Sequence, residues 1–416
     1  MKPGPGRYSG AVGAAAGGLG GKSASAACVR CAGRTRASDI LPGMRRTPSR
    51  YPLRAAVLLA AGGLLVGSPG NGRPAGSGPS VVAPAPVSAS RPFEHFARRR
   101  GVCWEGNGPI GIDHLRPVRE LGADWISQTP FGWSRALDAP EIHLATERVW
   151  WGESDSGLVQ TTRMARSLGL ATLLKPHLWI RHGQWTGDLR MRSEADWKTW
   201  FASYESWILH YARLAEAQKI EALAVGTELG GTSHRTGDWR RLIGRVREVY
   251  HGQLTYCANW HGEAERIEFW DALDYIGVQA YYPLATTERA DADTLRAAWR
   301  SIRAQLATLA ARTSKPIVFT EVGYKSVSGG LREPWRWETH GEPDMDLQRD
   351  AFATLFEILW PEPWFGGTFV WKWHPDLDHR VGRVECDFTP QGKPALSVIR
   401  DWYGAAGRSS RPAFRP

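Results

Sequence analysis

The sequence predicts an α/β fold, a (β/α)8 TIM barrel that forms a single domain over residues 93–403. Eight short apolar runs alternate there with patterns of helical period, as eight β/α repeats require. Two of the runs end in a glutamate, and the strand ends of such barrels carry the chemistry. A doubly wound open sheet is the rival fold, but no glycine-rich phosphate-binding sequence follows the first run. The barrel is therefore the favoured fold.

The predicted strands are short runs rich in apolar, β-branched and aromatic residues. They cover residues 101–104, 123–129, 171–179, 221–229, 254–260, 274–282, 316–324 and 366–373. Amphipathic helices are predicted between them. Residues 195–217 gather one apolar face from Trp200, Tyr204, Trp207, Ile208 and Tyr211. Residues 292–312 do so with Leu295, Trp299, Ile302, Leu306 and Leu309, and residues 394–402 supply the eighth helix.

The residues before the barrel differ from it in composition. Residues 1–43 are mostly small or basic and predict a disordered leader, unless Met44 is the true start. Residues 44–68 join a basic start to a short apolar core, which predicts a signal peptide, with an uncleaved N-terminal anchor as the alternative. Residues 69–92 read as a Pro/Gly/Ser linker and residues 404–416 as a disordered tail. We therefore expect an exported protein, periplasmic, extracellular or on the cell surface.

The formal charge of +10 is confined to the N-terminal region. Residues 1–91 hold twelve Lys or Arg and one acidic residue, Asp39, so they carry +11 and the rest of the chain −1. The near-neutral barrel argues against nucleic acid as a partner. Twenty-one tryptophans favour a sugar instead, because a flat aromatic ring packs well against a sugar face.

The cysteines and the acidic loops do not predict a metal or a cofactor. Cys28 and Cys31 form a lone CxxC in the leader, whereas Cys103 and Cys257 lie in strand patterns as small core residues. Two loops hold His and acidic residues together, but neither has the spacing of a zinc site. These loops contain His340, Glu342 and Asp344, and His374, Asp376, Asp378 and His379.

Two glutamates end matched strands. Glu228 ends the fourth predicted strand and Glu321 lies at the end of the seventh, nearly opposite on an eight-stranded ring. A retaining glycosidase needs two carboxyl groups roughly 5–5.5 Å apart, one as nucleophile and one as acid and base. A structural ion pair would explain one such glutamate, but two in matched positions favour a catalytic pair.

The motifs around these glutamates resemble a known family. They are Lys175-Pro176-His177, Gly226-Thr227-Glu228, Tyr281-Tyr282-Pro283, Thr320-Glu321-Val322-Gly323-Tyr324, Trp371-Lys372-Trp373 and Pro390-Gln391-Gly392-Lys393-Pro394-Ala395. Together they resemble glycoside hydrolase family 113, a family of endo-β-1,4-mannanases within the clan of retaining (β/α)8 glycosidases. The resemblance implies that Glu228 is the acid/base, Glu321 the nucleophile and Tyr281 the residue that orients the nucleophile. Much of the clan has Asn where this chain has Thr227, so the sugar 2-hydroxyl needs another contact.

Further residues at the strand ends are candidates to bind the substrate. Aromatic rings stack on sugars, while Lys, His and Asn hydrogen-bond to sugar hydroxyls. The candidates are Trp104, Lys175, His177, Trp179, Trp185, Asn259, Trp260, Tyr282, Trp371 and Trp373. Each has a structural alternative: Lys175 could pair with a core carboxylate, the tryptophans could simply pack, and the tyrosine pair could form an amphipathic rim.

We therefore expect an exported, monomeric hydrolase that acts on a polysaccharide or oligosaccharide, with mannan as the favoured substrate. Another β-glycan or an amino-sugar polymer is the alternative within the same chemistry. A catalytically inactive carbohydrate-binding barrel is the alternative from another class. A barrel enzyme that acts on something other than a sugar is a third, which a metal or phosphate site at the strand ends would support.

Overall fold

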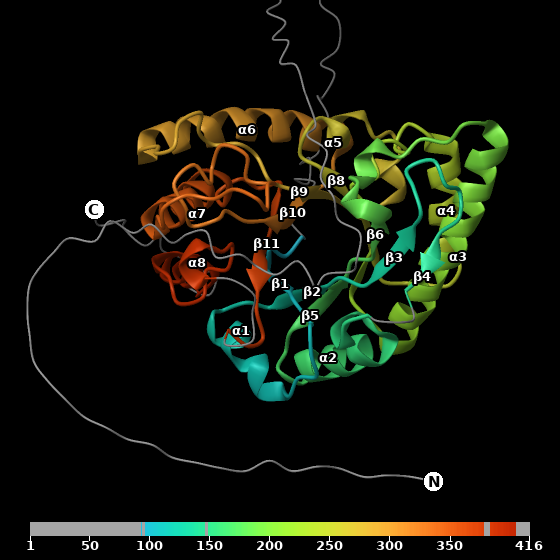
Figure 1. The fold of residues 1–416 in the computed structure, drawn as a ribbon, viewed down its shortest axis with the longest axis horizontal. Helices are drawn as coiled ribbons and strands as arrows, with labels where there is room; N and C mark the ends of the chain where they lie inside the picture. The colour runs from blue at the N-terminus through green and yellow to red at the C-terminus, as the bar shows by residue number, and fades with distance from the viewer. Residues whose placement is uncertain (1–92, 94–95, 146–148, 378–382, 405–416) are drawn as a thin grey trace, which may run out of the picture. The chain divides into compact units, whose positions relative to one another are not determined.

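The computed structural model describes residues 93, 96–145, 149–377 and 383–404. Eight parallel strands close into a barrel in the order β1-β11-β10-β9-β8-β7-β5-β2. Figure 1 shows the helices arranged around this ring of strands. The predicted (β/α)8 barrel is therefore confirmed, and its strands end where the sequence places Glu228 and Glu321.

Each predicted strand region contains one barrel strand. The strands are β1 (Arg99–Trp104), β2 (Trp125–Gln128), β5 (Ala171–Leu174), β7 (Ala222–Thr227), β8 (Gln253–Asn259), β9 (Tyr275–Gln279), β10 (Ile317–Val322) and β11 (Phe365–Trp373). The helices are α1 (Arg116–Glu120), α2 (Asp155–Ser167), α3 (Glu194–Gln218), α4 (Thr236–Arg247), α5 (Glu263–Arg266), α6 (Ala292–Thr313), α7 (Met345–Leu359) and α8 (Pro394–Gly404).

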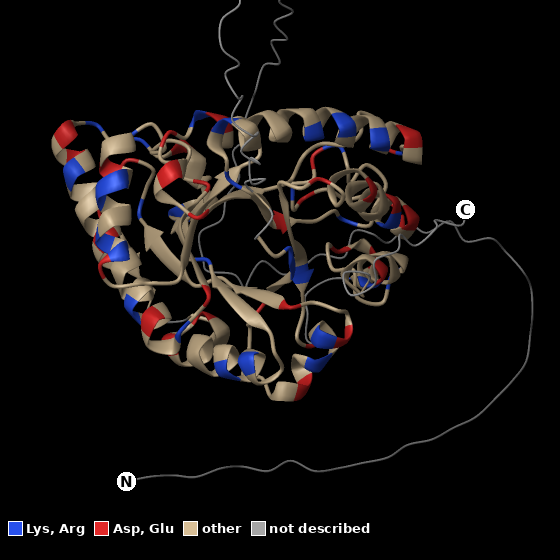
Figure 2. Cartoon of the chain, turned by 180° about the vertical axis from the view of Figure 1, so that it is seen from behind, with Lys and Arg blue, Asp and Glu red and all other residues tan. Residues whose placement is uncertain are grey.

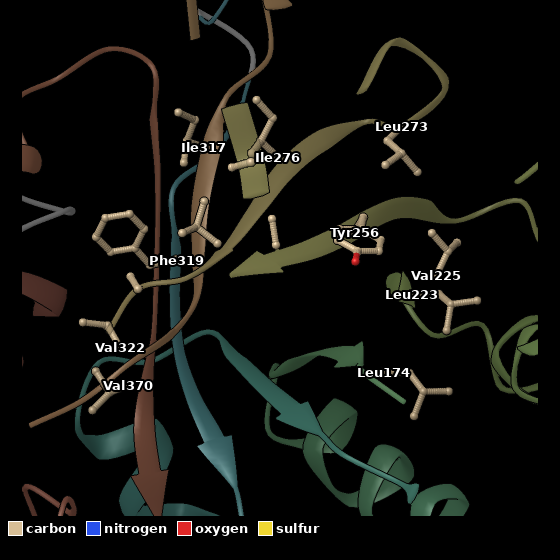
Figure 3. Packing of buried hydrophobic residues seen from close by; sticks show 14 of the residues in the cluster. Leu174, Leu223, Val225, Tyr256, Leu273, Ile276, Ile317, Phe319, Val322 and Val370 are labelled. Atoms are coloured by element: carbon tan, nitrogen blue, oxygen red, sulfur yellow. The ribbon is translucent and has the colours of Figure 1, made fainter. Parts of the chain in front are cut away.

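Side-chain alternation divides the core into two layers, as strand geometry requires. In β7, Ala222 and Ala224 point into the narrow barrel interior, where Cys103 and Cys257 are also buried, as predicted. Leu223 and Val225 point outward into the layer between the strands and the helices. Figure 3 shows this outer layer, whose larger side chains fill the space between the strands and the helices.

The long helices bury the predicted faces. In α3, Trp200, Tyr204 and Trp207 are buried, and Ser193 caps the helix by accepting a hydrogen bond from Asp196 N–H at 3.1 Å. In α6 the five predicted apolar residues are buried and Asp291 forms the equivalent cap. Figure 2 colours the Lys, Arg, Asp and Glu residues, many of which occur along the helices around the barrel.

The prediction of one continuous strand over residues 171–179 is wrong. Strand β5 ends at Leu174, and a separate strand β6 (His177–Ile180) pairs with β3 (Phe131–Ser134) in a second sheet of order β4-β3-β6, where β4 is His143–Leu144. Pro176 causes the break, because it lacks an N–H and restricts the residue before it. Pro130 interrupts the paired segment between β2 and β3 in the same way. Lys175 and His177 therefore do not share one strand, and Trp179 lies outside the barrel.

The predictions for the leader, the signal segment, the linker, the tail from residue 405 and the Cys28/Cys31 pair lie outside the described residues. Among the helices that the structure describes, none combines the length and the apolar character needed to span a membrane.

Candidate active site

Glu321 lies at the end of β10, with 4% of its surface exposed. The register of β10 against β9 shifts between Phe319 and Glu321, and such a bulge re-aims the side chain that follows it. The Lys175 ammonium forms a buried ion pair with Oε1 of Glu321. The Tyr281 hydroxyl donates a 2.6 Å hydrogen bond to Oε2. Each carboxylate oxygen of Glu321 is therefore held by a different side chain.

These partners determine the charge of Glu321. Burial alone would raise the pKa of its carboxyl, but the charge of Lys175 and the hydrogen bonds from Lys175 and Tyr281 outweigh burial and hold the pKa below its ordinary value. His177 Nε2 lies 3.7 Å from Oε1. Burial and the nearby Lys175 charge lower the pKa of His177 to about 3, so this ring is neutral near pH 7. Glu321 is thus an ionised carboxylate with a neutral imidazole beside it.

Glu228 follows β7 directly and has the opposite character. Its backbone is left-handed, with a φ of 51°, and the register of β7 against β8 shifts just before it, between Ala224 and Thr227. Asn259 Nδ2 donates a 2.7 Å hydrogen bond to Oε1, and Trp185 Nε1 lies 3.4 Å from Oε2. Burial and the Glu321 charge raise the pKa of Glu228 to about 7. Near neutral pH, Glu228 can therefore carry a proton while Glu321 is ionised.

A pair of carboxyl groups whose surroundings push their pKa values apart can divide the roles of acid and nucleophile. Here Lys175 stabilises the charge on Glu321, and Glu321 in turn disfavours a charge on Glu228. The protonation states of Glu228 and Glu321 are therefore coupled to each other, and both depend on the charge of Lys175. The arrangement can protonate one atom of a bound molecule while a carboxylate attacks another.

The structure brings some of the other candidates to these carboxyl groups. Asn259 and Trp185 contact Glu228, whereas Lys175, His177 and Tyr281 surround Glu321. Trp371 is half-buried, and its ring lies 5.8 Å from Lys175 Nζ. Thr227 donates its hydroxyl to the Pro176 carbonyl at 3.4 Å.

Other candidates pack in the core or stand further out. Trp104, Trp373 and Tyr282 are buried in the hydrophobic core. The Tyr282 ring packs against the rings of Trp299 and Trp260. Trp260 is half-buried and its ring centre lies 5.2 Å from that of Trp335. Trp179 is 40% exposed on the second sheet, in register with Trp133.

Sequence reasoning missed a charged network beside Trp371. Glu105 Oε1 accepts a 2.6 Å hydrogen bond from Lys372 Nζ, and Glu105 also pairs with His374 Nδ1. His374 Nε2 lies 3.0 Å from Asp387 Oδ2. Burial opposes the charge on His374, but the two carboxylates raise its pKa, so the ring is held between two negative groups. The only signal in the sequence was the Trp371-Lys372-Trp373-His374 run, because Glu105 and Asp387 lie far away in the chain.

No group of three or more His, Cys, Asp or Glu side chains is placed to hold a metal ion within residues 96–145, 149–377 and 383–404.

Comparison with known proteins points to one family. The family profile of Glycoside Hydrolase Family 113 matches residues 99–393. The chain is similar to the solved GH113 β-mannanase AaManA from Alicyclobacillus acidocaldarius in complex with ManMIm, with 29% identity, a TM-score of 0.67 and coverage of 76% of this chain and 99% of that one. A complex structure of a GH113 β-1,4-mannanase shares 25% identity, with a TM-score of 0.65 and coverage of 74% and 99%.

A more distant similarity concerns the fold alone. A β-glucuronidase from Ruminococcus gnavus in complex with D-glucuronic acid has 11% identity and a TM-score of 0.50, with coverage of 74% of this chain and 49% of that one. No match was found among curated protein sequences.

Proposed function

This chain belongs to glycoside hydrolase family 113, and from that premise we propose that it is a retaining endo-β-1,4-mannanase. The observation that carries the proposal is the pair of strand-end glutamates with opposed pKa shifts. Glu321 is held ionised by Lys175 and Tyr281, while Glu228 is held near a pKa of about 7. A retaining glycosidase needs a carboxylate nucleophile and a protonated acid at the start of its cycle.

In the proposed first step, Glu321 attacks the anomeric carbon and Glu228 gives its proton to the glycosidic oxygen. The bond to the leaving sugar breaks, and a glycosyl ester forms on Glu321. Asn259 Nδ2 donates to Glu228 Oε1 at 2.7 Å, a much shorter hydrogen bond than the 3.4 Å one from Trp185 Nε1 to Oε2, so we place the transferred proton on Oε2. In the second step, Glu228 takes a proton from water, and the resulting hydroxide displaces Glu321 with net retention.

Unpaired polar atoms support a sugar as the ligand. Among the buried ring nitrogens of the described residues that make no hydrogen bond, His177 Nε2 and Trp371 Nε1 lie beside the Lys175–Glu321 pair. Buried polar groups are normally satisfied, so such atoms mark places where a ligand supplies the partner. The hydroxyls of a sugar fit this need, and the exposed ring of Trp185 beside Glu228 offers a stacking surface.

Mannan is the favoured polymer because the solved relatives at 25% and 29% identity are β-mannanases. Thr227 bears on this choice, since its hydroxyl bonds to Pro176 and leaves the sugar 2-hydroxyl to other groups. Beyond Lys175 and Tyr281, which already hold Glu321, the side chains of His177 and Asn259 bring hydrogen-bonding capacity to the two carboxyls. Their arrangement is the feature that we expect to accept an axial 2-hydroxyl.

The experiment is reducing-end release from a panel of soluble glycans. Mannan, glucomannan, xylan, mixed-linkage glucan and chitosan are compared for the parent and for Glu321→Ala, with the exposed Glu120→Ala as the matched control. We expect release of oligosaccharides from the two mannans, loss of that release in Glu321→Ala, and no change in Glu120→Ala. Cleavage of a different glycan would contradict mannan as the substrate but would support the proposed glycosidase reaction. No release from any glycan would favour a carbohydrate-binding barrel without catalysis.

We further propose that the enzyme is a monomer that acts outside the cytoplasm. The support is the basic and apolar pattern of residues 44–68, which fits a signal peptide or an anchor. Fractionation of cells that express the full chain tests this, with a variant that lacks residues 44–68 as control. Activity that stays in the cytoplasm for both chains would contradict export.

A further inference from the structure

Glu263 is a buried carboxyl that no sequence motif pointed to. It opens the short helix α5, directly after β8, and 1% of its surface is exposed. Its Oε1 accepts a 2.6 Å hydrogen bond from the Tyr256 hydroxyl. Its Oε2 accepts a 2.7 Å hydrogen bond from the Asn259 backbone N–H. Burial raises the pKa of Glu263 to about 7, and the hydrogen bonds from Tyr256 and Asn259 oppose that rise by favouring the charged form.

Both partners of Glu263 lead to Glu228 by a second hydrogen bond. The Tyr256 hydroxyl accepts a 2.8 Å bond from the N–H of Leu229, the residue directly after Glu228. Asn259, whose backbone is held by Glu263, donates its side-chain amide to Glu228 Oε1 at 2.7 Å. One carboxylate therefore fixes the chain beside Glu228 and also the amide that contacts its side chain.

The conformation of Glu228 needs such support. Its φ of 51° lies in the left-handed region, which residues with a β-carbon adopt only when the surroundings hold them there. The Tyr256 ring is itself fixed against β7, since a β-carbon added at Gly226 would lie 2.7 Å from it. Trp239 and Phe269 pack on the same ring. The hydroxyl of Tyr256 is therefore presented to Leu229 from a rigid base.

We propose that Glu263 is a positioning residue for the acid step: its carboxylate holds Tyr256 and Asn259 so that Glu228 Oε2 carries its proton to the glycosidic oxygen. This inference rests on the proposed function, in which Glu228 is the acid/base. It assigns to Glu263 no contact with the substrate. Its effect on the reaction is confined to steps in which Glu228 transfers a proton.

The leaving group of the substrate separates this role from a general structural one. A leaving group as acidic as 2,4-dinitrophenol departs without a proton, whereas phenol and sugars need one. The value of kcat/KM reports the steps up to formation of the glycosyl-enzyme, so the later use of Glu228 as a base does not enter. Aryl β-mannosides of both kinds are therefore compared.

The test variant is Glu263→Gln, which keeps the side-chain shape but turns one acceptor oxygen into an N–H donor facing Tyr256 or Asn259. The matched control is Glu268→Gln, an exposed residue on the segment that follows α5, with the same change in charge. Because general acid catalysis contributes about 10²–10⁴-fold, we expect kcat/KM for the phenyl mannoside to fall by more than about tenfold. For the dinitrophenyl mannoside we expect a change below about threefold, and for Glu268→Gln no change with either substrate.

Equal loss on both substrates in a folded Glu263→Gln protein would overturn the inference, and so would no loss on either. Circular dichroism and the melting temperature decide whether the variant is folded. If it is not, Tyr256→Phe is used instead, because it removes the hydroxyl that links Glu263 to Leu229. The same comparison of phenyl and dinitrophenyl mannosides is then made. A parent protein that releases nothing from mannan or from any other glycan of the panel would overturn the proposed function itself, which is distinct from an active parent whose variant shows no selectivity.

Discussion

At the scale of single residues, Lys175 determines the charge state of the whole site. It is fully buried and pairs with Glu321, and its charge adds to the effect of burial, which together lower the pKa of His177 to about 3. A buried ammonium without an anion would be unstable, so Lys175 and Glu321 depend on one another. The sequence allowed two roles for Lys175, pairing with a core carboxylate or acting at the site. The ion pair with Glu321 fulfils both, because the carboxylate that Lys175 pairs with is the proposed nucleophile.

Replacing Lys175 by Met should move the acidic limb of the pH profile. Lys175 lowers the pKa of Glu321, so its removal raises that pKa, and the nucleophile becomes protonated at a higher pH. Activity should therefore fail earlier as the pH decreases. Profiles of kcat/KM against pH measure this, with the exposed Lys198→Met as control. An acidic limb that stays in place in a folded Lys175→Met protein would contradict the assignment of Glu321.

The basic limb should respond to Asn259. Activity is expected to fall as the pH rises through about 7, the pKa to which burial and the Glu321 charge raise Glu228. The amide of Asn259 donates to Glu228 and so favours its ionised form, which lowers this pKa. Asn259→Ala should therefore shift the basic limb to higher pH while lowering the maximal rate. A shift in the opposite direction would show that Glu228 is not the group that titrates.

At the scale of elements, the second sheet shows how closely a strand can pack on a helix. Gly132 in β3 faces α3, and a β-carbon there would lie 2.5 Å from Trp207 Nε1. The opposite face of this sheet carries His177 towards Glu321 and exposes Trp133 and Trp179. The close packing of β3 on α3 therefore depends on residue 132 being a glycine, which has no side chain.

Gly132→Ala should destabilise the protein by about 1–3 kcal/mol, the usual cost of forcing extra volume into a packed core. Gly244→Ala is the matched control, because Gly244 is exposed within α4 and has no atom within 4 Å of an added β-carbon. In a helix this change should stabilise by about 0.5–1 kcal/mol. Urea unfolding of both variants gives the two free energies. Equal effects would mean that β3 is not packed against Trp207 as described.

The elements also show what the sequence could predict. Apolar runs and helical period located all eight barrel strands and the buried faces of α3 and α6, because these depend on local pattern. The second sheet was missed because Pro176 was placed inside one predicted strand despite being a strand breaker, and because the pairing of β3 with β6 joins segments that lie far apart in the chain. Glu228 and Glu321 each follow a register shift, so strand alternation alone could not give their direction.

The supporting residues of the site were missed for a related reason. Glu105, Glu263 and Asp387 are single acidic residues in ordinary surroundings, and their partners lie elsewhere in the chain or form no motif. Their roles follow from contacts between strand ends. By contrast, Tyr281 could be placed beside Glu321 because the resemblance to the clan supplied that pairing.

At the scale of the whole molecule, the residues proposed to act on the substrate lie at one end of the barrel, and a cluster that stabilises the fold lies at the other end. Arg99, at the start of β1, is 2% exposed, and its guanidinium lies 3.9 Å from the Tyr275 ring centre and 4.3 Å from that of Trp125. It also donates to Gln253 Oε1 at 2.5 Å. All these residues begin or precede strands, at the end of the barrel opposite Glu228 and Glu321.

Arg99→Ala should lower the free energy of unfolding by about 2–4 kcal/mol, because it opens a cavity and removes cation–π contacts. The value of kcat/KM should stay within about twofold of the parent, since distant sites act independently. Chemical unfolding and kinetics on the same preparation test both parts. A large loss of activity at a temperature where the variant is folded would contradict this separation.

The central claim, a double displacement on Glu321, is tested most directly by trapping the glycosyl-enzyme. A 2-deoxy-2-fluoro-β-mannoside with an activated leaving group should form the ester and then stall, because fluorine disfavours the oxocarbenium-like transition state of the second step. Intact-protein mass spectrometry should show one added fluorosugar, and peptide mapping should place it on Glu321. The Glu321→Ala variant should show none. A label on another residue, or rapid turnover to a product of inverted configuration, would contradict the claim.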